Sequence, residues 1–237
     1  MFIDLHCHLL HAIDDGPRDA PGALATAKLL VTLGFDTVVA TPHALPQFPK
    51  EDVAAQRLAD LTSLLERERV PLKLVLGAEN RLDEAFIEAE VAGRGRHLGA
   101  TACTLVEAPY ESVVPALPEL LFRLRRKAVL PLLAHPERCA EFQELARAEE
   151  AVRLGAVLQL DVGSLVGAYG RQARKTALKL LEANLYAVAA TDTHDAEESA
   201  KWLPSALDEL ERRAGKPGRD RLLADNPARL LKGEELS

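Results

Sequence analysis

The sequence has 237 residues, which suits one domain with a sizeable hydrophobic core, and we expect residues 1–237 to form a single domain. Its 29 basic and 36 acidic residues give a net charge of −7, which argues against nucleic acid as a partner, because nucleic-acid-binding proteins present a basic patch. Three cysteines without metal-type spacing, no signal peptide and no apolar run of about 20 residues predict a cytoplasmic protein with no direct membrane insertion.

Short β-rich runs alternate with longer helical patterns along the chain. Pro21 fits the first turn of a helix, while Gly34 and Gly155 fit the position that follows one. In chain order, we predict strands near Phe2–Leu5, Thr37–Ala40, Leu72–Leu76, Cys103–Val106, Val129–Leu133, Val157–Leu160 and Ala187–Ala190. Helices are predicted near residues 21–33, 52–68, 82–91, 115–127, 141–154, 171–183 and 198–214, followed by a last short helix that begins near residue 226.

This alternation predicts an α/β fold with parallel strands. Histidines and carboxylates follow six of the seven predicted strands, which is where barrels collect functional residues. An open sheet binds its ligand at one switch point and would hardly gather side chains from so many strands. We therefore predict a closed or nearly closed seven-stranded barrel with the site at the carboxyl ends of its strands.

The first and last strands carry the clearest metal-binding pattern. His6 and His8 are two residues apart at a strand end, so their side chains point to the same side. An isolated pair of this kind could equally be one buried and one exposed histidine. A second such pair, Asp192 and His194, follows the last strand, and the two pairs would meet because these strands are neighbours in a closed barrel.

The remaining candidates lie at other strand ends. Glu79 and Glu107 each end an apolar strand, where a carboxylate is costly unless a cation, an arginine or solvent accompanies it. His43 and His135 could each be structural, but with the rest we favour ligation. Asp15 is our choice over its neighbour Asp14, which we assign to ligand support or to the turn. The predicted ligands are His6, His8, Asp15, His43, Glu79, Glu107, His135, Asp192 and His194.

Five imidazoles and four carboxylates are too many for one ion, because a catalytic metal usually keeps about three protein ligands and an open position. We expect about three divalent cations, with two as the alternative, and nitrogen and oxygen donors suit Mn, Fe or Zn. Arg138 lies three residues after His135 and is a candidate phosphate clamp, although an arginine facing solvent would fit the same pattern. Cations that ionise a water molecule predict hydrolysis of a phosphate ester.

A series of motifs resembles the PHP superfamily over essentially the whole chain. The motifs are D-L-H-C-H (4–8), D-D-G-P (14–17), T-P-H (41–43), G-A-E (77–79), H-P-E-R (135–138), T-D-T-H (191–194) and D-N-P-A-R-L-L (225–231). Within it, they are similar to the CpsB-type manganese-dependent protein tyrosine phosphatases of bacteria. This resemblance implies a distorted seven-stranded barrel of the PHP type with three metals. His6, His8, Glu79 and Asp192 would hold one, Glu79, Glu107 and His135 a second, and Asp15, His43 and His194 the third.

The resemblance also implies a substrate and a mechanism. Metal-bound hydroxide would attack the phosphorus of a phosphotyrosine on the tail of a membrane tyrosine autokinase that controls capsule or exopolysaccharide synthesis.

 We expect Arg138, His43 and Asp192 to take part in catalysis. Phe48, Tyr110 and Tyr169 could contact the substrate ring, although loop packing would explain them equally well.

Three other functions are compatible with parts of the pattern. The chain could be another PHP phosphoesterase, either histidinol-phosphatase-like or nuclease-like, or a non-catalytic module that binds a kinase tail. A cysteine phosphatase is excluded by spacing, because it needs an arginine six residues after its nucleophile. The residues six positions after Cys7, Cys103 and Cys139 are Ile13, Pro109 and Leu145.

Overall fold

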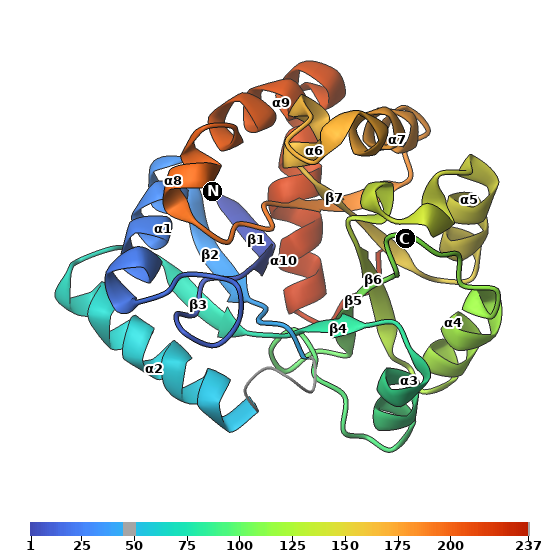
Figure 1. The fold of residues 1–237 in the computed structure, drawn as a ribbon, viewed down its shortest axis with the longest axis horizontal. Coiled ribbons are helices and arrows are strands. Elements are labelled where there is room, and N and C mark those ends of the chain that lie inside the picture. Colours follow the sequence, from blue (N-terminus) through green and yellow to red (C-terminus); the bar gives the residue numbers. More distant parts are fainter. Residues whose placement is uncertain (45–50, 237) are drawn as a thin grey trace.

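A computed structural model describes residues 1–44 and 51–236 of the protein. In these two ranges, strands occupy the centre of the molecule and helices surround them (Figure 1). All paired strands run parallel. The strands are β1 (Phe2–Cys7), β2 (Phe35–Ala40), β3 (Lys73–Leu76), β4 (Glu79–Arg81), β5 (Cys103–Glu107), β6 (Leu130–Ala134), β7 (Val157–Asp161) and β8 (Tyr186–Ala190).

The strands form two sheets, with the order β1-β2-β3 in one and β4-β5-β6-β7-β8 in the other. Backbone hydrogen bonds join the sheets at both seams. Between β1 and β8, the Asp192 amide donates to the His6 carbonyl at 2.9 Å. Beyond β2, the Glu79 amide at the start of β4 donates to the Pro42 carbonyl at 3.1 Å. Both of these bonds lie near residues predicted as metal ligands, so the seams position the candidate site.

The predicted parallel α/β fold is confirmed, but a continuous seven-stranded barrel is not, because the described residues form sheets of three and five strands. The additional strand is β4, which follows β3 after Gly77 and Ala78. A Cβ atom on Gly77 would lie 2.8 Å from Val39 Cγ1, so the chain passes close to β2 before it changes partner. β4 consists of Glu-Asn-Arg and has no apolar pattern that would predict a strand.

The helices largely match the predicted segments. The predicted helix at 198–214 is divided into two, because Pro204 lacks an amide hydrogen and suits the first turn of a new helix. The short α6 was not predicted. The helices are α1 (Ala20–Thr32), α2 (Glu51–Arg67), α3 (Glu84–Val91), α4 (Leu117–Arg126), α5 (Leu145–Arg153), α6 (Gly163–Val166), α7 (Gly170–Glu182), α8 (Ala196–Ala200), α9 (Leu203–Asp220) and α10 (Asn226–Leu231).

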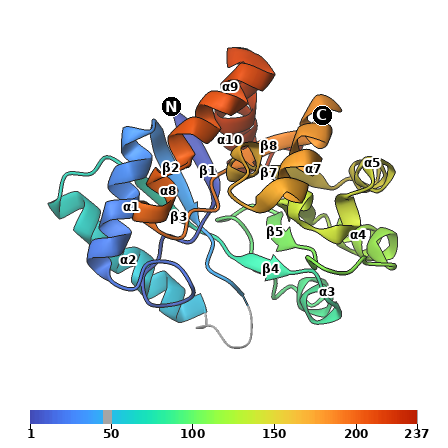
Figure 2. The same ribbon diagram turned by 45° about the horizontal axis from the view of Figure 1, so that its top comes forward.

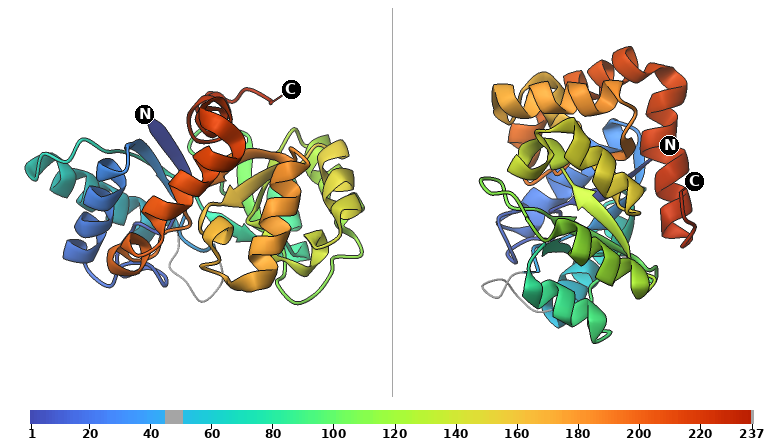
Figure 3. Two further views of the ribbon diagram at one scale, coloured as in Figure 1. Left: turned by 90° about the horizontal axis from the view of Figure 1, so that it is seen from above. Right: turned by 90° about the vertical axis from the view of Figure 1, so that its right-hand side faces the viewer.

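The apolar side chains form two layers, one inside the strands and one between strands and helices. Alternate strand residues point to opposite faces, so Leu105 belongs to the inner cluster and Val106 to the outer one. Figure 2 shows α1 and α2 outside the first sheet and α3, α4 and α5 outside the second. The right-hand panel of Figure 3 shows α10 and both termini on one side of the strands. Because the chain enters β1 there, this side holds the amino ends of the parallel strands.

Two further observations concern the surroundings in which the protein works. No helix in residues 1–44 and 51–236 is long and apolar enough to cross a membrane. Cys7, Cys103 and Cys139 are all buried and free.

Candidate metal centre

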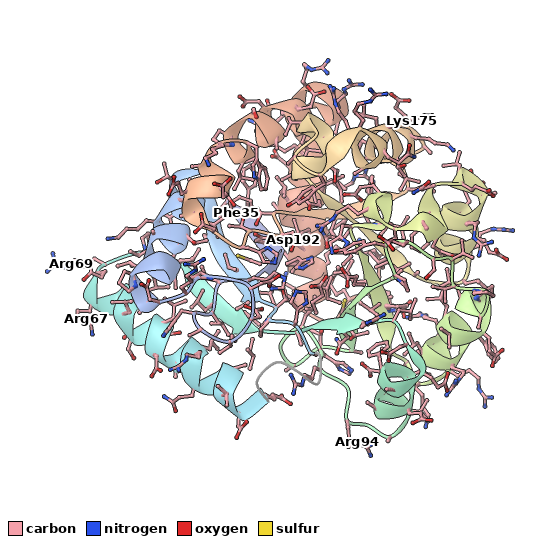
Figure 4. All side chains as sticks on the ribbon, in the orientation of Figure 1. Phe35, Arg67, Arg69, Arg94, Lys175 and Asp192 are labelled. Carbon is pink, nitrogen blue, oxygen red and sulfur yellow. The ribbon has the colours of Figure 1, made fainter. Side chains whose placement is uncertain are left out.

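The carboxyl ends of the strands bring all nine predicted ligands together. His6 lies in β1, Glu79 begins β4 and Glu107 ends β5, while the other six lie in the segments that follow strands. Side-chain donor atoms within 4.8 Å of one another define four overlapping groups. The groups are His8, Asp15, His43 and His194; His6, His135 and Asp192; His6, His8 and Glu79; and Glu79, Glu107 and His135. Figure 4 shows Asp192 near the middle of the molecule.

The positions of the nitrogen and oxygen atoms in this cluster are better explained by bound cations than by hydrogen bonds between the side chains. Asp192 Oδ1 is buried and accepts no hydrogen bond from the described residues, although His6 Nε2 lies 3.1 Å away. The Nε2 atoms of His6 and His8 are only 3.3 Å apart. Lone pairs of neutral imidazoles and carboxylates that converge in this way repel one another unless protons or cations lie between them. The donor set therefore fits divalent metals.

Three of the imidazoles are oriented by acceptors on their outer side. Nδ1 lies 3.0 Å from Gln159 Oε1 in His6, 2.8 Å from Asp14 Oδ2 in His8 and 2.8 Å from the Asp192 carbonyl in His194. Each acceptor favours the tautomer with hydrogen on Nδ1, which leaves Nε2 free to bind a metal. Such outer partners are typical of metal-ligating histidines.

Asp14 and Gly16 organise the loop that carries Asp15. Asp14 Oδ2 also accepts a hydrogen bond from the His43 amide at 3.2 Å, and Asp14 Oδ1 accepts one from the Gly16 amide at 3.0 Å. A Cβ atom on Gly16 would lie 2.4 Å from the His8 carbonyl oxygen, so the loop packs closely against β1 at this point. Asp14 therefore supports the neighbouring ligands through hydrogen bonds.

The backbone is strained at two of the candidate ligands. His135 has φ of 29° and Asp192 has φ of 48°, in the left-handed region that residues with a Cβ rarely occupy. Strain of this kind costs about 1–3 kcal/mol and concentrates at functional sites. Both side chains lie in the cluster, His135 directly after β6 and Asp192 two residues after the end of β8.

Buried carboxylates in the cluster raise the pKa of neighbouring histidines. Burial alone would lower the pKa of His6, but Asp192 and Glu79 outweigh it and raise the pKa to about 9. The pKa of His43 is likewise raised to about 9, because contacts with Asp15 and Glu79 outweigh its burial. The same negative field that holds protons on these rings would attract cations.

The sequence patterns did not reveal two buried supports. Gln159 on β7 reaches His6, as described above, and Asp4 lies in β1. The Asp4 carboxylate accepts hydrogen bonds from the Thr191 hydroxyl at 2.5 Å, the Thr191 amide at 3.1 Å and the His6 amide at 3.2 Å. Burial raises the pKa of Asp4 to about 6, although these hydrogen bonds oppose the rise. Asp4 thereby ties β1 to the segment that precedes Asp192.

Arg138 lies at the edge of the cluster. Its Nη1 donates to Asp192 Oδ2 at 2.5 Å and to Asp161 Oδ2 at 3.3 Å, and its Nη2 donates to the Tyr110 hydroxyl at 3.0 Å. The guanidinium also stacks 4.2 Å from the centre of the Tyr169 ring. These four residues hold a delocalised cation in one orientation beside the metal ligands.

A cavity of about 350 Å³ opens at Arg138 and is lined by both Tyr110 and Tyr169. Tyr110 and Tyr169 therefore lie beside Arg138 in one cavity. Phe48, the third predicted contact, lies outside the described residues.

Comparison with known proteins shows a family relationship. A family model described as "Capsular polysaccharide synthesis, CpsB/CapC" matches residues 2–232. The tyrosine-protein phosphatase YwqE of Bacillus subtilis (strain 168) is 34% identical over 238 residues, covering 99% of this chain and 93% of that protein.

Solved structures show the same relationship. One described as "YwqE from Bacillus subtilis and CpsB from Streptococcus pneumoniae, unique metal-dependent tyrosine phosphatases" matches with a TM-score of 0.88 and 29% identity, covering 99% of this chain and 96% of the other. An organophosphorus hydrolase from Deinococcus radiodurans matches with a TM-score of 0.60 and 16% identity, covering 97% and 92%, which shows a shared fold. Because the family model covers nearly all of the sequence, this chain belongs to the CpsB/CapC capsular polysaccharide synthesis family.

Proposed function

We propose that this chain is a metal-dependent protein tyrosine phosphatase in which residues 1–237 form a single phosphoesterase domain. The observation that carries the proposal is the convergence of nine imidazole and carboxylate side chains beside a partly buried, oriented arginine. The printed names of the relatives, which are tyrosine phosphatases, support the same activity.

We assign the ligands to about three divalent cations. His6, His8, Glu79 and Asp192 would hold one cation, Glu79, Glu107 and His135 a second, and Asp15, His43 and His194 a third, a division compatible with the four groups of donor atoms. Manganese is our preferred metal, with iron or zinc as alternatives that the same donors would accept. Bound cations would supply Lewis acidity and lower the pKa of water, which makes a nucleophile available near neutral pH.

The residues of the chain would orient the substrate. Arg138 would direct its planar guanidinium toward phosphate oxygens, while the fully buried Asp161 holds the guanidinium through a contact with Nη1. Tyr110 and Tyr169 would contact the aromatic ring of a phosphotyrosine. A tyrosyl phenolate has a pKa near 10, so its departure needs less acid assistance than that of an alkoxide.

The physiological substrate in this proposal is the phosphorylated tail of a membrane tyrosine autokinase that controls capsule or exopolysaccharide synthesis. The enzyme would meet this tail in the cytoplasm. The family description, which names capsular polysaccharide synthesis, supports the assignment.

The test compares substrates before and after metal removal. Purified protein is analysed for metal content and assayed with p-nitrophenyl phosphate, a phosphotyrosine peptide, histidinol phosphate and single-stranded DNA. We expect turnover of the first two, its loss on chelation and its recovery with manganese. Preferred turnover of histidinol phosphate or DNA would identify a different phosphoesterase. Peptide binding without turnover would identify a binding module.

A further inference from the structure

Three arginines line a second cavity, of about 220 Å³, beside the metal centre. The proposed reaction uses none of them. The lining includes Ala44, which follows His43, and Arg81, which lies two residues after Glu79 on β4. Since alternate residues of a strand point to the same side, Arg81 leaves β4 on the same side as Glu79. The cavity lining therefore includes residues one and two positions away in the chain from the candidate ligands His43 and Glu79.

The arginines of this cavity are available to an anion. In the described parts of the chain, neither Arg81 nor Arg94 forms an ion pair, and Arg96 approaches Glu51 only at 3.9 Å. The acidic residue in the lining, Asp83, is engaged as the cap of α3 and accepts a hydrogen bond from the Phe86 amide at 2.9 Å. In a protein with a net charge of −7, these three arginines are a local concentration of positive charge.

The loop that carries Arg94 and Arg96 is held in place from within. The Arg96 carbonyl accepts hydrogen bonds from Asn80 Nδ2 and from Thr104 Oγ1, both at 3.1 Å. The buried Glu90 carboxylate packs against Gly95 in this loop and lies 2.9 Å from His97 Nε2. A preformed loop loses little conformational entropy when a ligand binds.

We propose that this cavity binds an anionic side chain that flanks the phosphotyrosine in the substrate, either a carboxylate or a second phosphotyrosine. The inference rests on the phosphatase function proposed above and adds a determinant of sequence preference to it. Figure 4 shows Asp192 near the middle of the molecule and Arg94 at its lower edge, so Arg94 lies farther out than the candidate metal centre. Guanidinium groups in this position match carboxylate and phosphate oxygens through charge-assisted hydrogen bonds.

The experiment replaces the three arginines together, as Arg81→Gln, Arg94→Gln and Arg96→Gln. The readout is the ratio of kcat/KM for a phosphotyrosine peptide with flanking glutamates to kcat/KM for the same peptide with flanking glutamines. A third peptide carries a second phosphotyrosine, and glutamates are placed on either side of the phosphotyrosine in separate peptides. We expect the wild-type ratio to be about tenfold for at least one placement and to fall to about one in the triple variant.

The matched control removes the same charge elsewhere, as Arg67→Gln, Arg69→Gln and Lys175→Gln. Figure 4 shows all three residues at the edge of the molecule, well away from Asp192. This control should keep the tenfold ratio. An equal fall of the kcat/KM ratio in both triple variants would indicate a general effect of net charge and would overturn the proposal.

The remaining outcomes are equally distinct. A wild-type ratio near one for every acidic peptide, with normal turnover of p-nitrophenyl phosphate, would overturn the subsite while the phosphatase assignment stands. Absence of p-nitrophenyl phosphate turnover in manganese-loaded wild-type protein would overturn the phosphatase assignment itself. Preference for the doubly phosphorylated peptide over the glutamate peptide, lost in the arginine variant, would identify phosphate as the anion.

Discussion

Replacement of Gln159 by leucine tests whether a buried residue outside the ligand set controls metal binding. Gln159 is fully buried on β7, where its Oε1 lies 3.0 Å from His6 Nδ1 and its Nε2 donates to the Leu160 carbonyl at 3.0 Å. Leucine has a similar volume, so Gln159→Leu removes the amide without opening a large cavity. His6 then keeps its position in β1 but loses the acceptor that orients its ring.

The expected magnitude follows from this lost contact. An unpaired, buried donor on His6 costs about 1–3 kcal/mol, and the ring can relieve the cost by changing tautomer or rotating. Either response moves the Nε2 lone pair away from the cluster. Outer-shell changes of this kind lower metal affinity by roughly 10–100-fold, and we expect a loss in this range for manganese.

The assay is a manganese titration against a competing chelator, followed by activity measured as a function of free manganese. Gln159→Leu should shift both curves to higher manganese concentration. Gln56→Leu is the matched control. Within the described residues, the side chain of Gln56 forms a hydrogen bond only with the exposed Asp60. If folded Gln159→Leu binds manganese within twofold of wild type, the support assigned to Gln159 is wrong.

Three further predictions concern the arginine, the ligand loop and the ionisation of the cluster. Arg138→Lys should lower kcat/KM for a phosphopeptide by about 10²–10³-fold at unchanged metal content, because one ammonium group cannot replace the contacts with Asp192, Asp161 and Tyr110. A kcat/KM near the wild-type value at saturating manganese would contradict this. Gly16→Ala should destabilise the protein by about 1–3 kcal/mol in urea denaturation, since its Cβ would clash with the His8 carbonyl, and an unchanged midpoint would show that the loop adapts freely. The metal-free protein should lose stability as pH rises through about 9, because the pKa of His6 and of His43 is raised to about 9 in the folded protein. The stabilisation from their ion pairs is complete below the usual histidine pKa near 6.5 and is lost as the two rings lose their protons. Denaturation midpoints that stay constant from pH 6.5 to 10 would refute these ion pairs.

Much of the fold follows from local patterns. Apolar runs such as Val157–Leu160 predict buried strands, and their alternation with amphipathic segments predicts parallel pairing. β4 was not predicted because Glu-Asn-Arg has no such pattern. This strand pairs with β5 only after the chain has passed Gly77. The way in which the two sheets join depends on hydrogen bonds between residues far apart in the chain, such as those from Asp192 and Glu79 at the seams.

The sequence alone placed the imidazoles and carboxylates at strand ends, because parallel strands necessarily present their carboxyl ends on one side. It also indicated Arg138 through its distance from His135. Only the tertiary structure showed that Gln159 orients His6 across 153 positions, and that Asp4 reaches Thr191 across 187. It also revealed the cavity between Arg81 and Arg96. Local propensities act over a few residues, whereas contacts of this separation exist only after the sheets have assembled.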